Sequence, residues 1–243
     1  SSSKADSWGD YIPDRAGGPD TVDTSGGFFT SQDGTAYYPT TTKNSQQTFI
    51  EENFNAAFQT GTFWQNDLNI SGGNDKNTYF FSLSNLQQEG IIRGSDYDRT
   101  NIRFNYNAEL NDWISLSNKV AYTYTNSNLT QGNSNVGGIL LGHLRTPADF
   151  DNRDYIGTYT SSSGEEFTRR HRSYRRSLGN NENPIYNNPV WTTKEQLSLN
   201  QVNRLVVTPQ LTIKPYKWLQ LIARTNVDFA DDRRTFFFPR GSA

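Results

Sequence analysis

Residues 101–110 read NIRFNYNAEL, and they alternate strictly between polar and apolar side chains. The apolar set is Ile102, Phe104, Tyr106, Ala108 and Leu110, and the polar set is Asn101, Arg103, Asn105, Asn107 and Glu109. A helix would scatter both sets around its axis, whereas successive side chains of a strand point to opposite faces. The stretch therefore predicts a β-strand with one apolar face and one polar, charged face.

Five further segments of roughly this length show the same alternation less cleanly, at 64–71, 79–86, 114–125, 204–214 and 219–229. Phe80 interrupts a polar face, and Pro209 lies inside the fifth of them although proline cannot donate to a strand ladder. About ten residues are needed for a tilted strand to cross a bilayer. The pattern favours an all-β fold, in which about six antiparallel strands belong to a transmembrane β-barrel.

The connections between these segments alternate in length. Short ones lie at 72–77, 111–112 and 215–217, and longer ones lie at 90–98 and from 126 to about 195. Outer-membrane barrels have short periplasmic turns and long extracellular loops. The alternation therefore predicts that the long connections are extracellular.

Composition limits the alternatives. The chain has 243 residues, a formal net charge of -2 and no cysteine, which excludes disulfides, thiolate metal sites and a cysteine nucleophile and gives no overall attraction to nucleic acid. An aromatic content of 14% disfavours disorder. The chain starts at Ser1 without Met or a signal-peptide pattern, so we expect an internal piece of a longer protein.

Little in the sequence indicates catalysis. Its histidines are His143 and His171, and the common zinc-protease, hydrolase, P-loop and dinucleotide motifs are missing. His143 falls in a short helix predicted at 136–145, where packing within the loop is the favoured interpretation. Three carboxylates lie close together at Asp149, Asp151 and Asp154. Their spacing departs from an EF-hand loop and favours a solvated polar turn. We predict no enzyme activity and no cofactor.

The long connection carries the candidate recognition residues. Its charge run RRHRSYRR at 169–176 offers guanidinium groups, which suit lipopolysaccharide phosphates or an acidic protein surface, and its rings could stack on sugars or pack on a peptide. The candidate substrate or partner contacts are Tyr155, Tyr159, Arg169, Arg170, Arg172, Tyr174, Arg175, Arg176 and Trp191. Self-packing of the loop and hydration of the arginines explain the same composition, so that alternative stays open.

Several short stretches together resemble a known family. They include NISGGN at 69–74, YFFSLS at 79–84, QEGII at 88–92, NDWISL at 111–116 and NNPVW at 187–191. In order and spacing they are similar to the early barrel of the SusC/RagA family, which are TonB-dependent outer-membrane transporters of Bacteroidota. The resemblance implies a barrel of about 22 strands, a SusD-like surface lipoprotein as partner, coupling to TonB through a plug domain missing from this chain, and import of oligosaccharides or peptides.

On this interpretation the chain is a multi-pass segment of an outer-membrane barrel in contact with lipid. The expected divisions are an extracellular loop region at 1–61, four barrel strands at 62–125, a long extracellular loop with a short helix at 126–195, and two strands with the start of the next loop at 196–243. Two other classes stay open. A soluble secreted β-sandwich could display residues 155–191 as a ligand-binding loop, or a hydrolase could use a β scaffold.

Overall fold

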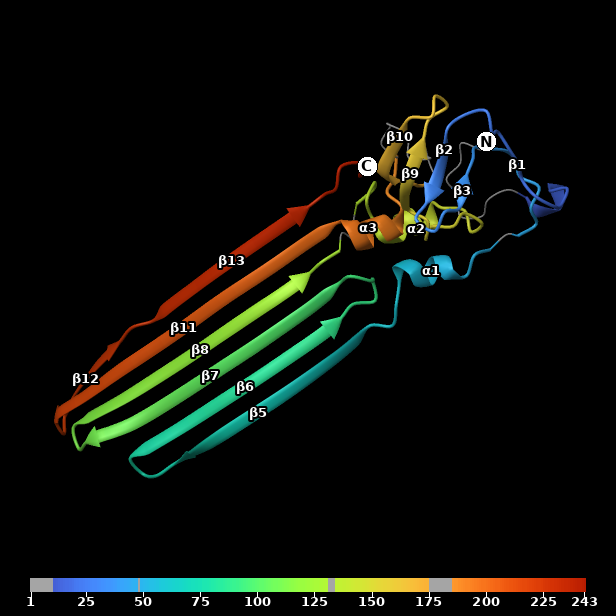
Figure 1. Ribbon diagram of the computed structural model, residues 1–243. Coiled ribbons are helices and arrows are strands. Elements are labelled where there is room, and N and C mark those ends of the chain that lie inside the picture. The colour runs from blue at the N-terminus through green and yellow to red at the C-terminus, as the bar shows by residue number, and fades with distance from the viewer. Residues whose placement is uncertain (1–10, 48, 131–133, 175–184) are drawn as a thin grey trace.

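The structure is a computed structural model that describes residues 11–47, 49–130, 134–174 and 185–243. It contains one long sheet and, at one end of that sheet, a small lobe of short strands and helices (Figure 1). Among the residues described, no helix is long and apolar enough to cross a membrane.

The long sheet contains all six predicted segments as antiparallel neighbours. Its strands are β5 (Thr62–Gly73), β6 (Asn77–Glu89), β7 (Asp96–Asn111), β8 (Ile114–Asn128), β11 (Leu197–Tyr216), β12 (Leu219–Arg224) and β13 (Val227–Phe237). They follow the order β12-β11-β8-β7-β6-β5, and β13 also pairs with β11. The predicted all-β, antiparallel fold is therefore confirmed. The described strands form an open sheet and do not close into a barrel.

The strand registers sort the side chains onto two faces, because directly opposed residues share a face. One row across the sheet contains Leu68, Leu83, Ile102, Tyr122, Leu205 and Phe229. The next row contains Ile70, Phe81, Phe104, Val120, Val207 and Val227. Nearer the short turns, further rows hold Ala108, Leu116, Leu211 and Ala223, and then Ile114, Ile213 and Leu221. We call this continuous surface the apolar band.

The opposite face of the same strands is polar. Two rows of this face alternate along the strands with the apolar rows of Leu68 and Ile70. The first contains Asp67, Ser84, Asn101, Thr123 and Arg204, and the second contains Asn69, Ser82, Arg103, Ala121, Val206 and Asp228. No described residue packs a second layer onto the apolar band, where Phe104 stays 40% exposed and Phe229 61% exposed. A β-sandwich would bury this face against another sheet. The described structure therefore lacks the second layer that the sandwich interpretation requires.

The strands are longer than the predicted segments. β7 has 16 residues and β11 has 20. Beyond the apolar band the strands continue with polar residues on both faces, as in the row of Asn66, Asn85, Thr100, Tyr124, Asn203 and Asp231. Alternation of hydrophobicity ends at that row, so it could not indicate where the strands themselves end.

Pro209 accounts for the division between β12 and β13. β13 pairs with β11 as far as Val207, and β12 resumes the pairing at Gln210 with no change of register. The Pro209 carbonyl accepts the N–H of Thr225 at 3.2 Å. The nitrogen of Pro209 faces the same outer strand, but it carries no hydrogen to donate. The outer strand is interrupted where its ladder loses a donor.

Short and long connections lie at opposite ends of the sheet, as the alternation in length predicts (Figure 1). At the short-turn end, the Asn111 side chain accepts the N–H groups of Trp113 and Ile114 at 3.0 and 2.8 Å. The Asn74 side chain caps the β5–β6 turn in the same way, at 3.0 Å to Lys76 and 2.9 Å to Asn77. These local hydrogen bonds explain why so few residues suffice to reverse the chain.

The lobe combines the two regions that were expected to be loops. Its strands are β1 (Thr21–Val22), β2 (Phe28–Ser31), β3 (Ala36–Tyr37), β4 (Thr40–Thr42), β9 (Ile156–Thr160) and β10 (Glu166–His171). Its helices are η1 (Ile12–Asp14), α1 (Glu52–Ala57), α2 (Ile139–Leu144) and α3 (Pro189–Glu195). The sheet order β10-β9-β2-β3 joins two strands that precede β5 to two strands that lie between β8 and β11 in the sequence. The predicted short helix is α2, whereas α3 and both hairpin strands of the long connection were not predicted.

Two small cores hold the lobe against the strand ends. One contains Tyr155, Ile156, Val190 and Trp191, and the other contains Ala57, Phe58 and Ile139. One residue, Gln196, separates α3 from β11. The Ala57 carbonyl accepts the N–H of Arg93 at 3.0 Å, which ties α1 to the β6–β7 connection. The lobe is therefore fixed to the long-connection end of the sheet.

Candidate functional site

The arginines of the charged run do not share one surface. Arg169 is exposed, has a left-handed backbone with φ of 52°, and lies 3.5 Å from the Glu195 carboxylate. The Arg170 guanidinium lies 5.2 Å from the centre of the Phe167 ring. Arg172 turns inward instead. Arg175 and Arg176 lie outside the described residues.

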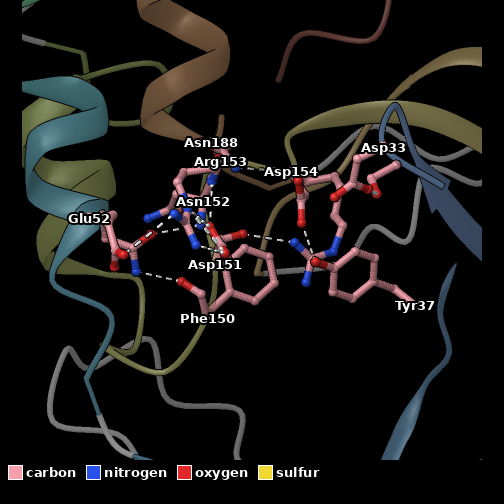
Figure 2. A network of polar contacts seen from close by, with 12 residues as sticks. Asp33, Tyr37, Glu52, Phe150, Asp151, Asn152, Arg153, Asp154 and Asn188 are labelled. Atoms are coloured by element: carbon pink, nitrogen blue, oxygen red, sulfur yellow. Dashed lines mark hydrogen bonds and ion pairs between the residues drawn. The ribbon is translucent and has the colours of Figure 1, made fainter. Parts of the chain in front are cut away.

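Arg172 lies within a polar network in the lobe. Figure 2 shows the neighbours Tyr37, Phe150 and Asp151 of this network. The Arg172 side chain lies between two rings, 3.8 Å from the centre of Tyr37 and 4.2 Å from that of Phe150, and the residue is only 6% exposed. Its Nη1 donates to the Asp151 carbonyl at 2.8 Å. Burial lowers the pKa of Arg172, and the nearby Tyr37 and Asp154 oppose that shift. Arginine nevertheless stays charged in proteins, so this cation is committed to the lobe interior.

Buried asparagines hold the loop that surrounds Arg172. Asn53 of α1 donates to the Phe150 carbonyl at 2.7 Å and accepts the Asn152 N–H at 2.8 Å. Asn188, which caps α3, donates to the Asn152 carbonyl at 3.0 Å. These amides satisfy the backbone polar groups of a loop that has no strand partner there. The network therefore depends on residues that lie far apart in the sequence.

The three clustered carboxylates each face a different partner. Asp149 lies 2.9 Å from both Arg15 and Lys43, and Asp154 accepts the Tyr37 hydroxyl. Asp151 pairs with Arg153 at 2.7 Å. Burial tends to raise the pKa of Asp151, but the hydrogen bonds from Arg153 lower it overall.

This arrangement corrects the predicted solvated turn, because the Asp149 and Asp151 side chains are only 13% and 19% exposed. The described residues include no group of three or more His, Cys, Asp or Glu side chains placed to hold a metal ion.

Two of the candidate aromatic residues belong to the lobe core. Trp191 is 2% exposed and stacks on His171 with ring centres 4.6 Å apart. Tyr155 meets Trp191 edge to face at 6.1 Å and donates its hydroxyl to Glu195 at 3.0 Å. For these two residues the structure shows self-packing of the loop. Tyr159 is half-buried and stacks on Phe167 at 6.1 Å.

Both histidines pack against rings. The His171 Nε2 accepts the Asn188 N–H at 3.0 Å, and burial lowers the pKa of His171 to about 3 despite a hydrogen bond with Gly241. His171 is therefore neutral near pH 7. His143 of α2 meets Phe54 and Phe58 edge to face, each at 5.8 Å, and burial lowers its pKa as well.

A cleft of about 830 Å³ opens beside the Arg172 network. Its aromatic lining is Tyr11, Tyr37, Tyr38, Phe150 and Tyr174, and its charged lining includes Arg15, Lys43, Asp149 and Asp151. Rings combined with hydroxyls and paired charges suit a polar ligand, such as a saccharide or a peptide, and the volume is in the range of ligand sites. Of the candidate residues, Arg172 and Tyr174 line this cleft. Sequence reasoning missed its other wall, because residues 11–43 show no periodicity that marks a site.

Comparison with known proteins gives a fold likeness. No protein-family profile and no curated protein matches the chain. A solved structure of the RagAB peptide transporter matches with a TM-score of 0.57 and 20% identity, covering 79% of this chain and 20% of that one. The RagAB peptide importer in the closed-closed state matches with a TM-score of 0.55 and 21% identity, covering 78% and 21%. This chain thus spans about a fifth of the length of these solved chains.

Proposed function

We propose that the chain is part of a TonB-dependent, SusC-like transporter of the outer membrane that imports oligosaccharides or peptides. The observation that carries this proposal is the apolar band, which continues in register through β5, β6, β7, β8, β11 and β13 while the other face stays polar. In a membrane barrel such a band contacts lipid and the polar face lines a wet interior. The role is that of a transporter wall, without catalysis.

The size of the band supports this proposal. From Leu205 to Ile213 it covers four steps of two residues, which is about 26 Å along a strand. A tilt of about 40° reduces this to roughly 20 Å, and the aromatic residues at the turns extend it toward the ~25 Å of outer-membrane barrels. Tyr216 and Trp218 stack there with ring centres 5.6 Å apart, and Trp218 is 80% exposed. Exposed rings at this level suit the lipid–water interface.

The two edges of the sheet support a place in a longer protein. β5 at one edge, and β12 with β13 at the other, each pair with one described neighbour. Unpaired backbone groups are not tolerated in hydrocarbon, so a spanning sheet must close. We propose that further strands of the same protein pair with both edges, and that a plug domain couples them to TonB, as the SusC/RagA resemblance implies.

The lobe is the part of this chain that we assign to the outer surface. There it would meet a SusD-like lipoprotein and cargo through the cleft beside Arg172 and through the exposed Arg169. Arg172, Tyr155 and Trp191 support that surface from the interior, because each is buried. Of the residues predicted from sequence, this leaves Tyr159, Arg169, Arg170 and Tyr174 as the described candidates for direct contact.

Cysteine labelling of intact cells tests the orientation, in a cysteine-free background of the complete transporter. Ser162 lies in the exposed turn between β9 and β10, and Asp112 lies in the β7–β8 turn. Ser162→Cys should react with a membrane-impermeant maleimide, and Asp112→Cys should react only after permeabilisation. Asp112 is preferred to Asn111, whose side chain caps the turn. Labelling in the opposite sense would refute the proposed orientation.

A further inference from the structure

The polar face of the long sheet has an excess of positive charge across its first four strands. The register places Arg99 and Arg103 of β7 and Lys119 of β8 on this face. Asp67 is the carboxylate in the same four rows of β5 to β8, which run from Gln65 to Ser71 on β5. Three cations therefore share these rows with one anion. We call Arg99, Arg103 and Lys119 the cationic patch.

Two members of the cationic patch lie close together without a counterion. Arg103 opposes Ala121, and Lys119 opposes Asn105, so the two cations occupy diagonal positions about 7–8 Å apart. Both are exposed, and neither makes a hydrogen bond or ion pair with any described residue. The Nε of Arg99 is buried without a hydrogen-bond partner among the described residues.

Two arginines elsewhere on the same face are paired with carboxylates within the sheet. Arg204 donates two hydrogen bonds to the Asp228 carboxylate, of 2.9 and 2.6 Å. Arg234 holds Asp232 at 2.7 Å. Strands β11 and β13 thus neutralise their own arginines, whereas β7 and β8 do not. Arg103 and Lys119 are therefore left without a carboxylate partner among the described residues, whereas Arg99 interacts electrostatically with Asp67 of β5.

The chemistry of the cationic patch fits a carboxylate. Guanidinium and ammonium groups form their strongest hydrogen bonds with ionised oxygens. The neighbouring amide Asn101, which accepts the Thr123 hydroxyl at 2.9 Å, adds polar but uncharged groups. Beside a low-dielectric wall, unpaired charges of one sign focus the field and concentrate counter-ions. An anion bound there would be attracted from solution and held by several donors.

We propose that the cationic patch is an anion-recognition site on the transport path, and that it takes the carboxylates of peptide cargo. The inference rests on the proposed transport function and decides between its two cargo classes. Every unmodified peptide has a terminal carboxylate and acidic peptides have more, whereas neutral oligosaccharides have none. A peptide rich in Asp or Glu is therefore the cargo that Arg99, Arg103 and Lys119 favour.

Uptake by the complete transporter tests this inference. The probes are a fluorescent ten-residue peptide with four Glu residues and its amidated counterpart with Gln at those positions. The double variant Arg103→Gln with Lys119→Gln should lower the uptake efficiency of the Glu peptide about tenfold, which is in the range that electrostatic attraction contributes, and leave the Gln peptide unchanged. Arg204→Gln with Asp228→Asn is the matched control, because it changes the same face without changing its net charge.

Charge reversal makes the test sharper. Arg103→Glu with Lys119→Glu should shift the preference toward a peptide with Lys at the four positions. An equal loss for all peptides at normal membrane levels would overturn the inference and assign the patch to a fixed acidic segment of the same protein. Unchanged uptake of the Glu peptide would overturn it too.

Binding to the purified transporter separates the two proposals. Fluorescence anisotropy should show weaker binding of the Glu peptide to the double variant. If the wild type binds this peptide through the patch but takes none up, the transport proposal fails and the recognition site stands. If the wild type imports peptides but the variant binds the Glu peptide equally well, the recognition site fails and the transport proposal stands.

Discussion

Phe104→Arg is the sharpest test of the lipid-facing assignment. Phe104 lies in the second row of the apolar band, between Phe81 and Val120, and its ring is parallel to that of Tyr106 at 6.4 Å. The substitution places a guanidinium on the face that we assign to lipid. It changes neither the backbone ladder nor the polar face.

The depth of Phe104 sets the size of the effect. Its row contains Val207, which is one step of two residues from the central row of the band at Pro209. That step is about 7 Å along the strand, so Phe104 lies near the midplane without reaching it. Arginine on the lipid face costs about 2 to 4 kcal/mol at the midplane and less toward the interface. We expect a loss of about 2 to 3 kcal/mol, which is a factor of about 30 to 140 in the folding equilibrium.

The assay is urea unfolding of the complete protein in lipid vesicles, followed by the heat-dependent gel mobility of folded barrels. Ser84→Arg is the matched control, because it adds the same group to the polar face opposite Asp67 and should cost less than about 0.5 kcal/mol. Phe104→Leu controls for loss of the ring. Equal destabilisation by Phe104→Arg and Ser84→Arg, or none by either, would refute the assignment of the faces.

Three other predictions concern the lobe. Arg172→Leu should lower the free energy of unfolding of the lobe by about 2 to 4 kcal/mol, because it removes a buried cation that lies between two rings and beside two carboxylates. Thermal unfolding measures this loss, and the exposed Arg169→Gln is the control that should have little effect. Equal effects of the two substitutions would contradict a stabilising role for the buried Arg172. His171 has a pKa of about 3 in the folded lobe against 6.5 when exposed, so the unfolded chain binds the extra proton and stability should fall as the pH drops from 6.5 toward 3, by up to about 1.4 kcal/mol per pH unit. His171→Gln should remove this part of the dependence of stability on pH. An unchanged dependence in that variant would show that His171 does not cause it. Replacing the arginines Arg169, Arg170, Arg175 and Arg176 by Gln, with Arg172 kept, should reduce co-purification with the surface lipoprotein at normal membrane levels, and unchanged co-purification would leave these arginines without that role.

The sequence by itself determined the long sheet and its two faces. The run at 101–110 alternates without exception, and the structure places Phe104 and Asn105 on opposite faces. This was predictable because the strand period of two is a local property of the backbone. The lengths of the connections also predicted which turns share an end, because an antiparallel ladder returns to the same end at every second connection.

Only the tertiary structure showed which strands pair and which side chains are buried in the lobe. The pairing of β2 with β9 places Phe29 opposite Tyr159, which is far from it in the sequence. Neither short strand has a periodic pattern that would have predicted it. Arg169 and Arg172 belong to the same charged run, yet one is exposed and the other lies between Tyr37 and Phe150. A guanidinium can be hydrated or can stack on rings inside a lobe. Which state it adopts depends on long-range contacts, and the order of residues along the chain does not contain them.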